Sequence, residues 1–170
     1  MTQLLHGDCL ELMKELPSES IDLVITDPPY RLVAGGCTKG GMANSGTFSQ
    51  NKNAVKKGTL FNHNDIEFSQ WIPEVYRVLK MRSHCYIMTN GRNLPRLFQE
   101  CEKAGFIYQN LLVWNKGNVT PNKWYMNQCE FILMLRKGKA KNINNMGTST
   151  LLSVKNIIGK RFTQQKNPLT

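Results

Sequence analysis

The chain has 170 residues, 41% of them hydrophobic, so it has the size of one ordinary domain and enough apolar residues to bury a core. No apolar run approaches the roughly 20 residues that a membrane-spanning helix needs, and the N-terminus lacks the charged-then-apolar pattern of a secretory signal. We therefore expect neither a membrane protein nor an exported one, and the formal net charge of +10 favours an anionic partner.

The first 30 residues predict a strand, a helix and a second strand. Residues 3–6 read as a short strand that ends in a turn at residues 7–8. Apolar residues recur at helical spacing through residues 10–16, and Pro17 ends this helix. Residues 21–26, IDLVIT, are nearly continuous in β-branched and apolar residues, which is typical of a parallel strand covered on both faces.

The next segment predicts a long loop followed by a helix and a strand. Residues 31–64 are rich in Gly, Asn, Ser and Lys and show little periodicity. Asp65 is suited to cap a helix over residues 66–80, whose middle Pro73 is expected to disturb. Residues 84–90, HCYIMTN, predict the next buried strand.

The remaining elements complete an alternating pattern. Residues 94–104 predict a helix that Asn93 opens and Gly105 closes. Residues 106–116 and 125–138 predict two strands, expected to form an antiparallel pair. Strands that alternate with helices indicate an α/β layered sheet, in which ligands gather at the carboxyl ends of the parallel strands.

The end of the chain differs from the rest in composition. Residues 138–170 are basic, polar and poorly periodic, with short strands conceivable at 148–154 and 156–159. We expect a catalytic region over residues 1–139 and, over residues 140–170, a basic linker or the start of a second functional segment.

The charge is unevenly distributed. Residues 31–64 carry five Lys or Arg and no acid, and residues 131–170 carry eight and no acid. Segments without carboxylates suit a polyanion such as nucleic acid, because each cation near a phosphate releases counterions. A merely solvated basic loop and tail is the alternative.

No metal or disulfide framework is expected. The histidines, His6, His63 and His84, have no ligand spacing. The cysteines form no CxxC pair, which indicates reduced thiols in a cytoplasmic protein. They are Cys9, Cys37, Cys85, Cys101 and Cys129.

The strand at residues 21–26 ends in Asp27-Pro28-Pro29-Tyr30. Two prolines fix the backbone and supply no N–H donor, so the site offers a carboxylate, carbonyl oxygens and an aromatic face. A planar group with an exocyclic NH₂ fits such a set of acceptors, and hydrogen bonds accepted from the amine would make its nitrogen a better nucleophile. An ordinary turn after a strand is the alternative.

These residues carry a resemblance to a family. The sequence resembles the amino-directed DNA methyltransferases, in the circularly permuted group where the catalytic tetrad precedes the cofactor block. The resemblance is carried by residues 7–30, 68–80, 84–90 and 111–139. The resemblance covers roughly residues 4–139. It implies an α/β, Rossmann-like methyltransferase sheet, mostly parallel with a C-terminal antiparallel strand pair. It also implies transfer of methyl from S-adenosylmethionine to an exocyclic amine in double-stranded DNA.

The resemblance also assigns roles. Asp at the first tetrad position favours adenine N6 over cytosine N4. Asp27 and the Pro28 carbonyl would hold the amine, in a tetrad that Pro29 completes, while Tyr30 would stack on a base flipped out of the duplex. Asp8 and Cys9, with Asp27, would lie at the cofactor, although a helix-capping role for Asp8 stays open. The candidate DNA contacts are Arg31, Lys39, Lys52, Lys56 and Lys57.

Two features depart from the family pattern. Residues 81–83, Met-Arg-Ser, replace the usual Pro-Gly-Gly-like turn, and no strand is followed by the glycine-rich cofactor loop. The glycine-rich residues 34–42 follow the tetrad and open no helix, so we interpret them as a loop. In the permuted group the missing block would lie downstream of Thr170. We therefore expect an incomplete sheet with an unpaired edge at residues 21–26, in a homodimer or beside a complementing C-terminal segment.

Three functions stay open. The first is DNA adenine-N6 methylation as part of a larger or complemented enzyme, and the second is a non-catalytic DNA-binding or regulatory remnant. The third, methylation of another amide such as a protein glutamine, is disfavoured because related enzymes usually carry Asn where this chain has Asp27. For Trp114 and Trp124, a role in the core or strand pair is favoured over base stacking.

Overall fold

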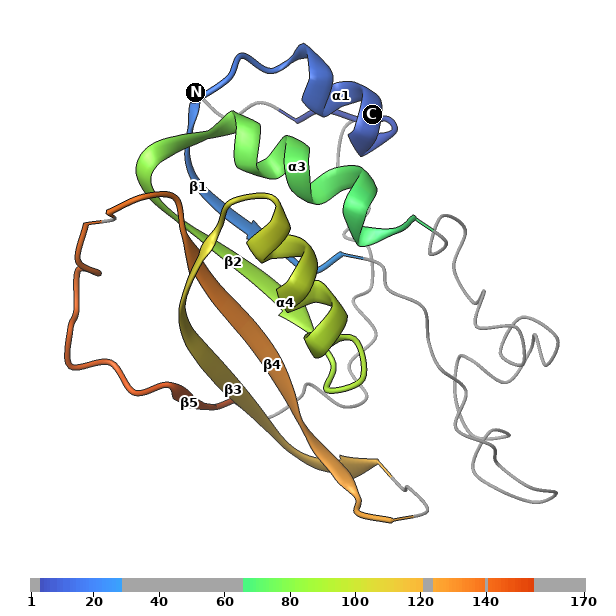
Figure 1. Cartoon of the computed structure of the whole chain (residues 1–170). Coiled ribbons are helices and arrows are strands. Elements are labelled where there is room, and N and C mark those ends of the chain that lie inside the picture. The colour runs from blue at the N-terminus through green and yellow to red at the C-terminus, as the bar shows by residue number, and fades with distance from the viewer. Residues whose placement is uncertain (1–3, 29–65, 121–123, 140, 155–170) are drawn as a thin grey trace, which may run out of the picture.

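The computed structural model describes residues 4–28, 66–120, 124–139 and 141–154 (Figure 1). In these ranges helices and strands alternate from α1 to β3, as predicted, and two further strands follow. The elements are α1 (Cys9–Glu15), β1 (Ile21–Thr26), α3 (Phe68–Val78), β2 (Leu79–Thr89), α4 (Leu94–Lys103), β3 (Ile107–Thr120), β4 (Asn127–Arg136) and β5 (Leu151–Ser153). Among the described residues, no helix combines the length and apolar character that crossing a bilayer requires.

The strands form one mixed sheet in the order β1-β2-β4-β3-β5. β1 and β2 are parallel, with Thr26 opposite Ile87. β4 runs antiparallel to both of its neighbours, β2 and β3, which confirms the predicted antiparallel pair. β5 adds a short parallel strand at the outer edge of β3, inside the stretch 148–154 where a strand was conceivable.

The core lies between the sheet and the helices α3 and α4, which cover one face of it (Figure 1). Leu10 and Met13 of α1 pack against the same cluster. In β2 and β4, alternate side chains point into this core, because successive residues of a strand face opposite sides of the sheet. The core residues are Phe68, Trp71, Ile72, Val75, Leu79, Cys85, Ile87, Leu97, Cys101, Phe106, Leu133 and Leu135.

The helix α3 begins with a capping box at Glu67 and Gln70, where each side chain meets the backbone of the other residue. The predicted cap, Asp65, lies outside the described residues. The helix runs through Pro73 to Val78, and β2 follows without a loop. β2 therefore begins five residues before the predicted start at residue 84.

The stretch 81–83 lies inside β2 as an irregularity rather than as a separate turn. Arg82 has a positive φ of 68°. The pairing with β1 jumps there, from Ile21 opposite Leu79 to Leu23 opposite His84. The extra residues on β2 make a bulge. This bulge contains residues 81–83, which stand where the family pattern has a Pro-Gly-Gly-like turn.

Two expectations for the N-terminal region are wrong. Residues 4–8 form no strand, and Leu4 is exposed. The expected covering of β1 on both faces is also absent in the described structure, because Leu23 and Ile25 are exposed, Ile25 by 70%. The second result has a physical reason: among the described elements the helices lie on one face of the sheet, so the other face of β1 is left open. No described strand pairs with the outer edge of β1.

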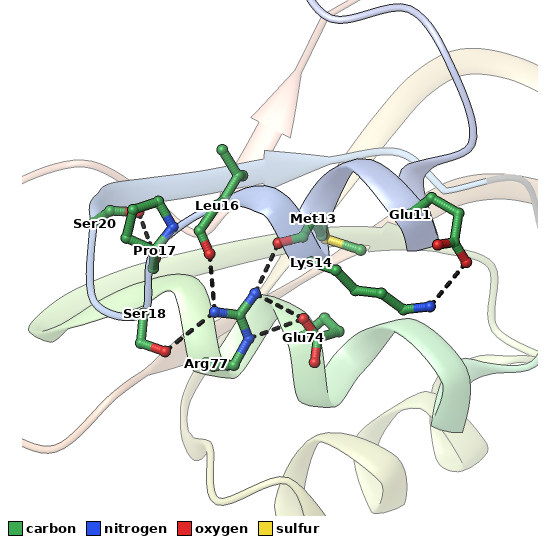
Figure 2. Close-up of polar contacts among 9 residues, drawn as sticks. All are labelled: Glu11, Met13, Lys14, Leu16, Pro17, Ser18, Ser20, Glu74 and Arg77. Atoms are coloured by element: carbon green, nitrogen blue, oxygen red, sulfur yellow. Dashed lines mark hydrogen bonds and ion pairs between the residues drawn. The ribbon is translucent and has the colours of Figure 1, made fainter.

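Two cationic side chains tie the layers together. Arg77 of α3 donates to the main-chain oxygens of Met13 and Leu16 at 2.7 and 2.9 Å, which holds the end of α1 (Figure 2). Lys137 is buried, and its ammonium donates to the main-chain oxygens of Tyr76 and Leu79 at 2.9 and 2.8 Å. α1 and the end of β4 are thereby fixed to the segment that joins α3 to β2.

Candidate functional site

The carboxyl ends of β1 and β2 lie next to each other at one edge of the sheet. Thr26, the last residue of β1, lies opposite Ile87. Asp27 follows β1 directly, and Asn90 follows the last residue of β2. Ligands of parallel sheets gather at this edge. The structure therefore puts Asp27 where a sequence-based reading of the fold expects chemistry.

Asp27 is exposed and Pro28 is half buried. The carboxyl group of Asp27 is still partly shielded from water, and this burial raises its pKa above the ordinary value. The carboxylate of Glu130 raises the pKa further, as the smaller of the two causes. Glu130 belongs to β4, so the two acids come from strands on either side of β2. An exposed carboxylate at a strand end can accept hydrogen bonds from an amine. Pro29 and Tyr30, the rest of the predicted tetrad, lie outside the described residues.

A half-buried ion pair lies on the neighbouring strands. The Lys116 ammonium is 2.6 Å from a carboxylate oxygen of Glu130, and their side chains are only 17% and 27% exposed. Lys116 is on β3 and Glu130 is on β4, where Trp114 is the direct partner of Glu130. Lys116 thus supplies a positive charge that offsets the second acid near Asp27.

Hydrogen bonds extend this polar layer along β3 and β4. The carboxamide oxygen of Asn115 accepts from the side chain of Gln128 and from the backbone N–H of Gly117, both at 3.0 Å. We did not predict Lys116, Glu130, Asn115 or Gln128 as site residues. The sequence does contain a feature that could have indicated them. Polar residues stand at the end of β3 and at the start of β4, next to the strongly apolar parts of both strands.

Asn90 organises the start of α4 at the same edge. Its carboxamide oxygen accepts from the backbone N–H groups of Arg92 and Asn93, at 3.0 and 2.9 Å. The side-chain nitrogen of Asn93 is buried and finds no acceptor among the described residues. The edge therefore offers an unmet donor as well as the acceptors of Asp27 and Pro28.

Asp8 caps α1. Its carboxylate accepts from the backbone N–H of Leu10 at 2.8 Å, which is the helix-capping role that had been left open. Cys9, the first residue of α1, is exposed. In the described structure no hydrogen bond or ion pair joins either residue to Asp27, so their assignment to a cofactor stays a prediction.

The candidate DNA contacts Arg31, Lys39, Lys52, Lys56 and Lys57 all lie outside the described residues. The two tryptophans have different places. Trp114 is half buried and its indole N–H donates to the main-chain oxygen of Val154 at 2.7 Å, which agrees with a structural role. Trp124, which was expected in the core or strand pair, is 80% exposed and lies before β4, in the connection from β3.

Comparisons with known proteins identify the family of the chain. A family model described as DNA methylase matches residues 21–168. The chain is 32% identical over 154 residues to the DNA adenine methyltransferase YhdJ of Escherichia coli, covering 89% of this chain and 46% of the relative. It is 32% identical over 122 residues to the Type II methyltransferase M.HinfI of Haemophilus influenzae, covering 72% of this chain and 33% of the relative.

Solved structures support the fold. The crystal structure of the M1.HpyAVI-SAM complex matches with a TM-score of 0.62 at 21% identity, over 96% of this chain and 70% of that chain. The cytosine-N4-specific PvuII DNA methyltransferase matches with a TM-score of 0.57 at 16% identity, over 92% of this chain and 58% of that chain.

The described sheet with its helices is thus an incomplete Rossmann-like α/β fold, as predicted. The chain spans between about a third and half of the length of the curated relatives named here. The match of the family model over most of the sequence shows that this chain belongs to the DNA methylase family of amino-directed methyltransferases.

Proposed function

We propose that this chain supplies the catalytic region of an enzyme that transfers a methyl group from S-adenosylmethionine to the N6 amine of adenine in double-stranded DNA. The observation that carries the proposal is the position of Asp27, exposed at the carboxyl edge of the sheet and followed in sequence by Pro28, Pro29 and Tyr30. The adenine assignment is supported by Asp at the first position of this tetrad and by the similarity to YhdJ.

The proposed chemistry depends on acceptors. The ionised carboxylate of Asp27 and the main-chain oxygen of Pro28 accept hydrogen bonds from the target amine, and Tyr30 stacks on the flipped base. These contacts would raise the electron density on the amine nitrogen as its bond to the methyl carbon forms. The sulfur–methyl bond would break, its electron pair would stay on sulfur as a thioether, and the amine would release one proton to solvent. The cofactor supplies the electrophilic methyl group. Lys116 holds the carboxylate of Glu130, so this second acid does not compete for the amine.

The residues present fit the cofactor in part. The unmet N–H donor of Asn93 and the exposed carboxylate of Asp27 are suited to the polar groups of S-adenosylmethionine. One oxygen of Asp8 already caps α1, so the second oxygen is the one left for a ligand. The described residues contain no glycine-rich turn between a strand and a helix at this edge. We therefore propose that part of the cofactor site is supplied by another segment.

We propose that the outer edge of β1 is where this segment binds, either from a complementing polypeptide or from a second copy of the chain. The edge has unpaired backbone groups in the described structure, and Leu23 and Ile25 beside it are exposed. An apolar strand edge of this kind readily takes another strand. Light scattering of the purified chain, with and without the complementing part of a longer relative, tests the two sources.

A second candidate function is a DNA-binding or regulatory remnant that transfers no methyl group. The same exposed residues of β1 favour it, because they show that the described part of the site is open on one side. The two functions differ in one measurable property, which is the transfer of labelled methyl groups to DNA.

The test is a single-turnover assay of the chain together with its complementing segment, with DNA and S-adenosylmethionine labelled in the methyl group. Asp27→Ala should lower the rate by roughly 10²–10³-fold, the usual loss when one preorganised electrostatic contact is removed. Asp22→Ala is the matched control, because Asp22 lies on β1, the strand that Asp27 follows, and its side chain is 82% exposed. An Asp27→Ala variant that keeps most of the rate would refute the catalytic role. DNA binding without transfer by the wild-type protein would support the remnant.

A further inference from the structure

A hollow of about 360 Å³ lies on the face of the sheet away from α3 and α4. Its lining includes His84, Asn110, Met134 and Arg136. These positions alternate along their strands with core residues such as Leu135, so their side chains point to the opposite face. The segment that follows β4 supplies the rest of the lining, and the volume is in the range of ligand pockets.

The lining of this hollow is cationic. Arg136, Lys139 and Lys141 all contribute to it, and no Asp or Glu does. Among the described residues none of the three forms an ion pair with a carboxylate. By contrast Lys80, for example, pairs with Asp22 at 2.7 Å. Three uncompensated cations around one concave surface attract an anion.

The arginine at this hollow is held in place by neutral partners. Its guanidinium donates to the side-chain oxygen of Gln109 at 3.0 Å and to the main-chain oxygen of Gly138 at 2.6 Å. Neither partner cancels its charge, so Arg136 is oriented and still fully cationic. A guanidinium that is fixed in advance loses less entropy when it binds a phosphate oxygen.

The segment carrying the two lysines is attached to β2. The backbone N–H of Lys141 donates to the oxygen of Arg82 at 3.4 Å, and the N–H of Arg82 donates to the oxygen of Lys137 at 2.9 Å. Met134 forms a buried apolar floor, and His84 stands beside it on the neighbouring strand. The hollow therefore combines an apolar base with a cationic rim on a fixed backbone.

We propose that this hollow binds a backbone phosphate of a nucleic-acid strand, at a place separate from the reaction edge. The identity of the ligand as nucleic acid rests on the proposed function, whereas its anionic character rests on the lining alone. A phosphodiester offers several acceptor oxygens and one negative charge, which suit an oriented guanidinium and two mobile ammonium groups.

The hollow is separate from the reaction edge. Arg136 lies opposite His84, whereas Thr26 lies opposite Ile87, so Asp27 is four residues further along the sheet. At about 3.3 Å per residue this is about 13 Å along the strands. A phosphate held in the hollow would therefore contribute to affinity and not to the chemical step.

The double variant Lys139→Gln/Lys141→Gln tests this site. Both side chains are exposed and have no ion-pair partner among the described residues, so the fold should be unaffected. The control is Lys14→Gln/Lys103→Gln, which makes the same change in net charge on α1 and α4. The affinity for a fluorescent DNA duplex is measured by anisotropy over a series of salt concentrations.

The logarithm of the DNA association constant falls linearly with the logarithm of the salt concentration. In the Lys139/Lys141 variant this negative slope should be shallower by about 1, which corresponds to the loss of one phosphate contact. The control should keep the wild-type slope, and methyl transfer at saturating DNA should be unchanged in both. Equal slopes in the two variants would overturn the proposal. If inorganic phosphate binds at the hollow but leaves the affinity for DNA unchanged, the hollow is an anion site that nucleic acid does not use, and the assignment of the ligand as nucleic acid is overturned. Absence of methyl transfer by the wild-type chain in the presence of its complementing segment would count against the proposed function alone.

Discussion

Replacing Arg77 with Met should loosen α1 from α3. The Arg77 guanidinium donates to the main-chain oxygens of Met13 and Leu16, donates to the Ser18 hydroxyl at 3.1 Å and pairs with Glu74 at 2.8 Å (Figure 2). Met13 and Leu16 lie at the end of α1, where the Met13 oxygen accepts only the N–H of the C-cap Leu16 from the helix end, at 3.1 Å, so Arg77 supplies a further donor. Met retains most of the aliphatic length of Arg but has no donor, so all of these contacts are lost together.

The magnitude follows from burial. The side chains of Arg77 and Glu74 are 31% and 27% exposed, so their ion pair contributes about 0.5 kcal/mol after screening. Each of the two hydrogen bonds to carbonyl oxygens contributes about 1 kcal/mol, because water replaces part of what is lost. The sum is about 2.5 kcal/mol. For a domain of this size, that lowers Tm by roughly 5–10 °C.

Urea unfolding and hydrogen exchange of the folded protein measure the two parts of this prediction. The free energy of unfolding should fall by the stated amount, and the amides of α1 should lose protection more than those of α3. Lys103→Met is the control, since Lys103 is exposed and pairs only with Glu100, and should change stability by less than about 0.5 kcal/mol. An Arg77→Met protein as stable as this control, with α1 still protected, would refute the reasoning.

The other predictions concern Glu130 and Lys137. A nearby negative charge favours the protonated form of Asp27, so Glu130→Gln should lower the pKa of Asp27, and the acidic limb of methyl transfer should move to lower pH. Carboxyl-carbon NMR titration of Asp27 checks this, with Glu100→Gln as control, and an unshifted titration would contradict it. Lys137→Met removes the donor to two main-chain oxygens and should cost about 2–3 kcal/mol in urea unfolding, whereas a change below about 1 kcal/mol would show that these bonds are exchanged for water at no loss.

Elements with a regular apolar period could be predicted from the sequence. The apolar face of α3 and the strongly apolar strands β3 and β4 appear where they were expected, because burial of those side chains determines both the period and the element. The start of α3 was less certain. Asp65 is a favoured cap, but Glu67 and Gln70 form a reciprocal pair of hydrogen bonds, which needs the backbone of both residues in place.

The candidate site could be predicted only in part. Asp27 was identified because a rigid dipeptide follows a strand at a known edge of the fold. Lys116 and Glu130 are 14 residues apart, and their contact depends on the register of β3 against β4. The register shifts between Asn115 and Thr120, where β3 leaves regular pairing, so the sequence spacing alone does not bring these two side chains together.

β1 is the element in which the sequence and the described fold differ most. A strand with one face in solvent usually alternates apolar and polar residues, whereas IDLVIT is apolar almost throughout. Its exposed apolar residues, Leu23 and Ile25, lie just before Asp27, which follows the strand. A segment that covered them would also border the carboxyl edge where Asp27 lies. The apolar face left open in the described fold therefore adjoins the residue proposed to act on the amine.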